Sequence, residues 1–310
     1  MTTAICTLFE GNYHIGAAAL INSLHASGFR GRFLCGLRGP FPPWAEPSRE
    51  GPDGSRICDF DGLEVRLIPL ATPIHFTNYK PAFLLETWEG HAGDPDQYYY
   101  LDPDIVAKCP WEPLERWGHG GVALCEDVNA YLPPRHPLRL GWLEWAEKEN
   151  LRVTATERNR YYSAGFVGVP RSQRPLLTLW NDLIARIGAS TGTLATIKQG
   201  GPTSLFHTAD QDALNLALML ADAPVNSTGP EGMDFAVGGH YLSHAIGPHK
   251  PWHGGFFKRA LRGYPPSAPA KAFFNHGQQG PLRIFSPAEL RRHQRSLALA
   301  ALIGRFYRRS

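Results

Sequence analysis

Residues 98–106 read YYYLDPDIV, and this stretch decides the fold prediction. Its aromatic and apolar residues predict a buried strand over 97–101, and Asp102 and Asp104 follow that strand directly. Open α/β sheets bind ligands at the carboxyl ends of their strands. Two carboxylates at that edge can hold a hard divalent cation that also takes diphosphate oxygens and water. A solvated Asp-Pro turn is the alternative interpretation, and the short motif alone does not decide between the two.

Short apolar runs alternate with segments of helical periodicity around this motif. We predict strands at 3–9, 32–37, 63–70, 97–101, 120–126 and 161–169. We predict helices at 14–27, 79–89, 172–187 and 208–221, and a Pro/Gly-rich loop over 39–54. The repeated order strand–helix–strand predicts an α/β fold with a mostly parallel central sheet flanked by helices.

The composition excludes several classes of protein. The chain has 310 residues, 43% of them hydrophobic, so it can bury a sizeable core and is neither disordered nor a coiled coil. Its 31 basic and 28 acidic side chains give a formal net charge of +3, which does not favour nucleic acid as a partner. We expect neither a secretory signal nor a membrane span, since no apolar run approaches about 20 residues. Five widely spaced cysteines without a CxxC motif favour a reducing, cytoplasmic location.

A second motif, HAIGPHKPW, covers residues 244–252. His244 can ligate a metal through a neutral imidazole. Gly247 permits close approach of the backbone to a ligand, and Lys250 offers a point charge suited to phosphate. Each of these residues alone is more often structural, but the combined pattern seldom arises by chance.

A third motif, DQDALN, covers residues 210–215 at the start of a predicted helix. Acidic residues in a first turn are also favoured by the helix dipole, and the leucines that follow would pack in a core. A structural role and a functional one are therefore compatible here.

With these motifs, the chain resembles the glycosyltransferases of the GT-A fold, and most closely glycosyltransferase family 8 and its relatives. The matching motifs occur in the expected order along the chain: NYHIGAAALINSL (12–24), YLDPD (100–104), SAGFVGV (163–169), DQDALN (210–215) and HAIGPHKPW (244–252). The resemblance implies a GT-A-like domain that transfers a hexose from a nucleotide-diphosphate sugar with the help of a divalent metal.

The resemblance also implies roles at the metal and the diphosphate. Asp102 and Asp104 would bind Mn²⁺ or Mg²⁺, with His244 as the third protein ligand. Lys250 and the backbone of Gly247 would hold the diphosphate.

The rest of the donor has implied partners as well. Thr7, Asn12 and Tyr13 would border the nucleoside, with Tyr13 stacking on the base. Asp210 would hydrogen-bond to hydroxyls of the donor sugar, and Gln211 would lie beneath its anomeric carbon.

Three positions depart from the family pattern. Lys80 stands where the family commonly has an Arg that approaches the donor sugar and phosphate, and the two side chains are not equivalent. Ser163 stands in place of an Asn, and the acidic residue usual before Asn-Tyr is displaced to Glu10. These departures leave the nucleotide and the sugar open more than the fold.

Members of the resembled family retain the anomeric configuration. A retaining glycosidase uses a carboxylate nucleophile, whereas the candidate position here holds Gln211, a poor nucleophile. Our hypothesis is therefore same-face attack assisted by the leaving phosphate oxygen. The expected donor is UDP-glucose or UDP-galactose, and the expected acceptor is a saccharide or a lipid-linked glycan, as in bacterial envelope polysaccharide assembly.

Two other functions stay open. A sugar-nucleotide nucleotidyltransferase would carry a Gly-rich, basic loop after its first strand, and LFEGNYHIG (8–16) contains no Lys or Arg. A catalytically silent sugar-nucleotide-binding module is disfavoured by the intact set of Asp102, Asp104, His244 and Lys250.

Residues 286–310 differ from residues 1–285, which we expect to form the catalytic domain. Ser286 to Glu289 form a capping box. Apolar and basic side chains follow at helical spacing: Leu299, Leu302, Ile303 and Phe306, with Arg291, Arg292 and Arg295 before them and Arg305, Arg308 and Arg309 at the end. The pattern predicts an amphipathic helix. It either contacts the inner face of the plasma membrane as a peripheral anchor or packs on the domain.

Overall fold

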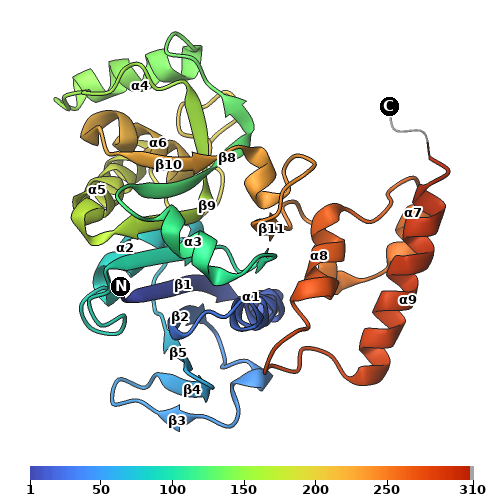
Figure 1. Cartoon of the computed structure of the whole chain (residues 1–310). Coiled ribbons are helices and arrows are strands. Elements are labelled where there is room, and N and C mark those ends of the chain that lie inside the picture. Colours follow the sequence, from blue (N-terminus) through green and yellow to red (C-terminus); the bar gives the residue numbers. More distant parts are fainter. Residues whose placement is uncertain (308–310) are drawn as a thin grey trace.

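The computed structural model describes residues 1–307. Nine strands of this part form one sheet, and β9 and β4 run opposite to the other seven (Figure 1). The mostly parallel sheet predicted from the sequence is thereby confirmed. Across the sheet the order is β10 (Val225–Thr228), β8 (Val122–Tyr131), β9 (Arg160–Pro170), β6 (Gln97–Leu101), β1 (Thr3–Glu10), β2 (Gly31–Arg38), β5 (Leu63–Pro69), β4 (Arg56–Phe60) and β3 (Arg49–Glu50).

The central strand β1 shows why the sheet is covered on both faces. Cys6 and Leu8 belong to one hydrophobic core and Ile5 and Phe9 to another, because successive side chains of a strand point to opposite faces. A parallel strand buried on both sides carries a nearly continuous apolar run, which is what residues 3–9 show.

Helices cover the two faces of this sheet. One core receives α1 (His14–Ala26) and α3 (Trp111–Trp117). The other core receives α2 (Phe76–Thr87), α4 (Pro137–Lys148), α5 (Arg174–Thr191) and α6 (Ala209–Ala221).

Most of the predicted elements are confirmed within a few residues, and β6 has the predicted bounds. No predicted strand covers β4, which lies directly before β5. The two strands form a hairpin whose turn places Asp61 and Gly62 at positive φ, 45° and 83°. Such an Asp-Gly pair between two strands is a recognisable hairpin signal. Helix α4 was missed as well. It begins at Pro137, and the side chain of His136 accepts a hydrogen bond from the backbone N–H of Leu138.

Three helices lie beside the sheet and share a core of their own (Figure 1). They are α7 (Phe256–Leu261), α8 (Ala268–His276) and α9 (Pro287–Gly304). Trp252, Phe256, Phe273 and Phe274 are the large buried side chains of this third core. The predicted capping box of α9 is present: Ser286 Oγ accepts from the backbone N–H of Glu289, and Glu289 Oε2 accepts from that of Ser286.

Helix α9 divides its apolar side chains between the core and the surface. Leu297 and Ala300 are buried in the core shared with α7 and α8, whereas Leu299 and Leu302 on the helix, and Phe306 just after its end, are 54%, 50% and 83% exposed. Arg308 and Arg309 lie outside the described residues. Within residues 1–307, no helix has the length and apolar character needed to cross a bilayer.

Helix α1 packs closely on the turn that carries the two carboxylates, because it presents a glycine there. A Cβ at Gly16 would lie 2.4 Å from the carbonyl oxygen of Pro103 and 2.8 Å from the ring of Trp252. The turn between Asp102 and Asp104 is therefore held against α1 by backbone contact.

We expect Gly16→Ala to lower the free energy of unfolding by about 1–3 kcal/mol, the usual cost of overpacking. Urea unfolding measures this change. Gly90→Ala is the matched control, since a Cβ at Gly90 would meet no atom of the described chain within 4 Å. Equal stability of the two variants would show that α1 can move away from the turn at no cost.

Candidate active site

A cleft of about 1270 Å³ opens at the carboxyl ends of β1 and β6. This is the edge at which α/β sheets bind ligands. Ten of the twelve residues that the sequence analysis singled out line it: Tyr13, Lys80, Asp102, Asp104, Ser163, Asp210, Gln211, His244, Gly247 and Lys250. Thr7 and Asn12 do not. Thr7 is fully buried in β1, and Asn12 is exposed, with its Nδ2 3.4 Å from His253 Nε2.

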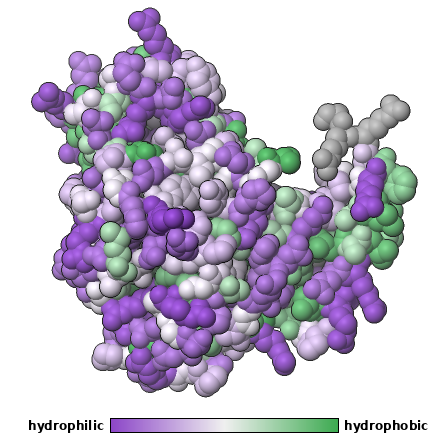
Figure 2. Space-filling view, in the orientation of Figure 1, coloured by the Kyte–Doolittle hydropathy of each residue, from purple (hydrophilic) through white to green (hydrophobic). Residues whose placement is uncertain are grey.

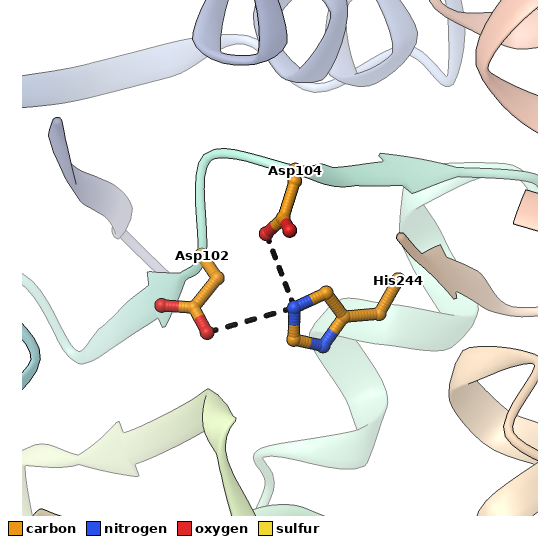
Figure 3. A group of neighbouring side chains, drawn as sticks. All are labelled: Asp102, Asp104 and His244. Atoms are coloured by element: carbon orange, nitrogen blue, oxygen red, sulfur yellow. Dashed lines mark ion pairs between the residues drawn. The ribbon is translucent and has the colours of Figure 1, made fainter. Parts of the chain in front are cut away.

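Asp102, Asp104 and His244 converge, although His244 lies 140 residues further along the chain. Asp104 leads into β7 (Ile105–Ala107), and His244 ends β11 (Leu242–His244), which pairs with β7 so that His244 stands opposite Ile105. Figure 3 shows the three side chains pointing toward one another. His244 Nε2 lies 3.1 Å from Asp104 Oδ1 and 3.6 Å from Asp102 Oδ2.

This donor set fits a divalent metal. The three ligand atoms lie within 4.8 Å of one another. Oxygen and nitrogen ligands bound to one cation at about 2.1–2.5 Å are spaced in this way. A side chain at position 165 would fill the space, because a Cβ on Gly165 would lie 2.8 Å from Asp102 Oδ2 and 2.7 Å from His244 Cε1. Gly165 lies within the motif SAGFVGV (163–169), for which the sequence predicted no role at this position.

Two buried lysines form ion pairs with the carboxylates. Lys250 Nζ lies 2.5 Å from Asp104 Oδ2 and donates to the carbonyl of Ala245 at 2.7 Å. Lys80 Nζ lies 3.0 Å from Asp210 Oδ2 and 3.2 Å from Asp102 Oδ1.

The charges of this group shift one another's pKa values. Burial by itself raises the pKa of Asp104, but His244 and Lys250 outweigh it and the pKa lies below its usual range. Burial lowers the pKa of His244, yet the carboxylates of Asp104 and Asp102 outweigh burial and the pKa is raised. Lys80 has a raised pKa for the same reason, with Asp102 and Asp210 as its partners. Each of these shifts favours the charged form of its group relative to the same side chain in water.

Gln211 is fixed at both ends of its amide. Its Oε1 accepts from the backbone N–H of Ala164 at 3.1 Å, and its Nε2 donates to Asp127 Oδ2 at 3.0 Å. Asp127 lies on β8 and lines the cleft, and the sequence analysis missed it. The signal was available, because Asp127 directly follows the strand predicted at 120–126 and so reaches the same edge of the sheet.

Aromatic residues support the charged groups. Tyr100 Oη donates to Asp102 Oδ1 at 2.9 Å. The ring of Tyr13 packs edge-on against Trp252, with centroids 5.5 Å apart, and Lys250 Nζ lies 5.5 Å from the Tyr13 centroid. Glu10 lines the cleft and is paired with Arg38 at 2.7 Å.

The fold is shared with known glycosyltransferases, although no family model and no curated protein matches the chain. The galactosyltransferase LgtC, solved with donor and acceptor sugar analogs, matches with a TM-score of 0.53 and 18% identity over 94% of this chain and 99% of that one. An active-site mutant of LgtC, in which a glutamine is changed to glutamate, matches with a TM-score of 0.52 and 16% identity over 93% of this chain and 99% of that one. The bifunctional glycosyltransferase WbbM matches with a TM-score of 0.54 and 14% identity over 94% of this chain and 51% of that one. The chain has the GT-A fold that its motifs predict.

The first turn of α6, which carries Asp210 and Gln211, is anchored by a buried carboxyl group. Asp212 Oδ1 accepts from Tyr161 Oη at 2.7 Å, and Oδ2 accepts from the backbone N–H of Thr208 at 2.8 Å. Burial raises the pKa of Asp212 to about 7. This anchor replaces the side-chain cap that Thr208 at the N-cap position does not provide.

Because the folded pKa of Asp212 lies above its unfolded value, the carboxyl stabilises the fold most at low pH and loses that contribution as pH rises from about 4 to about 7. Each tenfold change in proton affinity is worth about 1.4 kcal/mol. We expect Asp212→Asn to flatten the pH dependence of the unfolding free energy over this range, as urea titrations at several pH values would measure. Parallel curves of unfolding free energy against pH for the wild-type protein and Asp212→Asn would contradict the raised pKa of Asp212.

Proposed function

We propose that this protein is a metal-dependent glycosyltransferase that uses a nucleotide-diphosphate hexose, with UDP-glucose or UDP-galactose as the donor. One observation carries the proposal: Asp102, Asp104 and His244 converge beside Lys250 in the cleft of a GT-A fold. Mn²⁺ or Mg²⁺ bound there would neutralise the charge that grows on the departing diphosphate. Solved structures of the same fold come from proteins named as glycosyltransferases.

The donor's diphosphate would lie between the metal ligands and Lys250. Gly247 has a φ of +89°, and a Cβ there would meet no atom of the described residues within 4 Å, so its backbone is open to a ligand. Tyr13, which also lines the cleft, would stack on the base. Thr7, fully buried in β1, and Asn12, exposed outside the cleft, do not line it, and the proposal assigns neither side chain a contact with the nucleoside.

The donor sugar would bind between α2 and α6. Asp210 is buried, and within residues 1–307 its Oδ1 has no hydrogen-bond partner, so a sugar hydroxyl can donate to it. Lys80 holds the other oxygen of this carboxylate. Ser163 Oγ accepts from the backbone N–H of Gly165 and stiffens the neighbouring wall.

Retention of configuration follows from Gln211 in this proposal. Its amide is held by Ala164 and Asp127 and bears no charge, so it stabilises a positive anomeric carbon without forming a stable covalent bond. The acceptor hydroxyl oxygen attacks the anomeric carbon on the face that the diphosphate leaves. The bond from that carbon to the phosphate oxygen breaks, and the phosphate oxygen takes the acceptor's proton.

The acceptor in this proposal is a saccharide or a lipid-linked glycan, and nucleic acid is not a partner. Peripheral contact with the inner face of the plasma membrane would involve the surface of α7 and α9. Leu261, Leu299, Leu302 and Phe306 are exposed there among basic side chains. Such a mixture suits an anionic lipid surface.

We expect the protein to hydrolyse UDP-glucose or UDP-galactose slowly in the presence of Mn²⁺ and not in the presence of EDTA, with release of UDP as the readout. Asp104→Asn should lower the rate at least about 100-fold, since even residues outside the metal's direct ligands contribute about 10- to 100-fold. The exposed Asp182→Asn is the control and should keep the wild-type rate. Release of pyrophosphate from a nucleoside triphosphate and a sugar phosphate would instead identify a nucleotidyltransferase. Binding of the nucleotide sugar without turnover would identify a catalytically silent binding module.

Lys250 has two partners in this proposal, Asp104 before the donor binds and the diphosphate afterwards. While Lys250 Nζ lies 2.5 Å from Asp104 Oδ2, this oxygen is not available to a metal. A diphosphate that draws Lys250 away frees that oxygen, which couples metal binding to donor binding.

We therefore expect Lys250→Gln to raise the Mn²⁺ affinity of the nucleotide-free protein several-fold and to lower the UDP affinity in the presence of Mn²⁺ about tenfold, a difference of about 1.4 kcal/mol. Calorimetric titration measures both affinities. Lys258→Gln, on the exposed face of α7, is the control. Loss of Mn²⁺ affinity without nucleotide would show that Lys250 supports the metal site instead of competing for it.

A further inference from the structure

A second cavity, of about 420 Å³, adjoins the cleft. The two spaces share part of their lining, including Val128, Phe235, Ile246 and Gly247. The segment around Ile246 and Gly247 is therefore a common wall, with the proposed donor site on one side. A ligand that enters the cleft can extend past this segment without leaving the protein surface.

The far part of the second cavity is formed by α7 and the segment that leads to α8. Phe256 and Tyr264 contribute aromatic surface, and Pro248, Pro265 and Pro266 contribute rings without a backbone N–H donor. Such a lining offers few hydrogen bonds to a sugar. It suits a hydrocarbon chain or another apolar group better.

One cation in this cavity, Arg259, lacks an acidic partner among residues 1–307. The guanidinium carbon of Arg259 lies 5.6 Å from the ring centroid of Tyr264. In the part of the chain that the structure describes, no carboxylate lies within 4.0 Å of the Arg259 side chain. The acidic residue of the lining, Asp234, is paired with Lys108 at 2.5 Å. The cavity therefore favours an anionic group near Arg259.

The cavity continues toward the exposed apolar surface of α7 and α9. Tyr264 is 64% exposed, and Pro265 packs on α9, where a Cβ at Gly304 would lie 2.6 Å from Pro265 Cβ. Leu261 and Leu302 stand exposed on these two helices. Figure 2 shows hydrophobic side chains gathered on this side of the molecule, with hydrophilic ones between them.

We propose that this cavity binds the aglycone of a lipid-linked acceptor, with a phosphate ester on Arg259 and the hydrocarbon chain over Tyr264 toward α7 and α9. The inference rests on the proposed glycosyltransferase function, because it places the accepting sugar in the cleft. It selects phosphate-linked lipid glycans over free saccharides as the acceptor class.

Octyl phosphate, octyl β-glucoside and inorganic phosphate test the proposal as probes, each below its aggregation concentration. Binding to the full chain is measured by calorimetry in the presence of UDP and Mg²⁺, so that the proposed nucleotide site is filled. We expect octyl phosphate to bind about tenfold more tightly than octyl β-glucoside, as a charge-assisted contact implies, and inorganic phosphate to bind more weakly than either.

Variants locate the binding. Arg259→Gln should weaken octyl phosphate about tenfold and change octyl β-glucoside less than twofold, whereas Tyr264→Ser should weaken both alkyl probes. Arg262→Gln, at the end of the same helix and outside the cavity lining, should change neither. If Arg259→Gln and Arg262→Gln lose equal affinity for octyl phosphate, the probe binds a general basic surface, and the proposal is overturned.

Two further outcomes separate this inference from the proposed function. If octyl phosphate binds only when UDP is absent, it occupies the nucleotide site and the aglycone cavity is wrong. Mn²⁺-dependent donor hydrolysis by the wild-type chain is measured in parallel. Donor hydrolysis without binding of octyl phosphate would refute only the proposed aglycone site. Binding of octyl phosphate without donor hydrolysis would refute only the proposed glycosyltransferase activity.

Discussion

The structure depends on the balance of charge at the buried edge of β6. Three carboxylates meet three basic groups there: Asp102, Asp104 and Asp210 with Lys80, His244 and Lys250. A buried ion without its partner costs several kcal/mol. The partners come from α2, α6, β11 and the segment after it, so each of these elements must reach the same point. The remainder of the fold can be understood as the arrangement that brings them there.

The same balance explains how a resting site can be ready for a doubly charged ion. Lys250 pairs with Asp104, and Lys80 is shared by Asp102 and Asp210, so two ammonium groups offset part of the negative charge of the three carboxylates without a metal. Backbone carbonyls of Ala164 and Ala245 accept from the two ammonium groups and fix their positions. A ligand that brings both a cation and a diphosphate supplies one partner for the carboxylates and another for Lys250. Charge is then conserved locally while the contacts change.

Much of this site could be predicted from the sequence, because its residues follow strands or open helices. Asp102 and Asp104 follow a strand with an unmistakable apolar run, and Asp210 and Gln211 open a helix. What could not be predicted depends on contacts between distant segments. The hydrogen bond from Gln211 to Asp127 joins α6 to β8, and no local pattern encodes it. Predicting which side of α9 is buried also requires the positions of α7 and α8. Helical periodicity identifies an apolar face, but it does not show which element that face packs against.

The two adjoining cavities differ in the chemistry of their linings. The cleft gathers the buried charges, and a site of that kind suits a donor whose leaving group is ionic. The second cavity has aromatic and proline walls and holds Arg259, which has no carboxylate within 4.0 Å among residues 1–307, and this lining suits the distal part of the proposed acceptor. Both use the segment around Ile246 and Gly247 as a wall. Lys250 follows Gly247 by three residues, so the residue proposed to hold the diphosphate and the shared wall of the proposed acceptor cavity belong to one short segment.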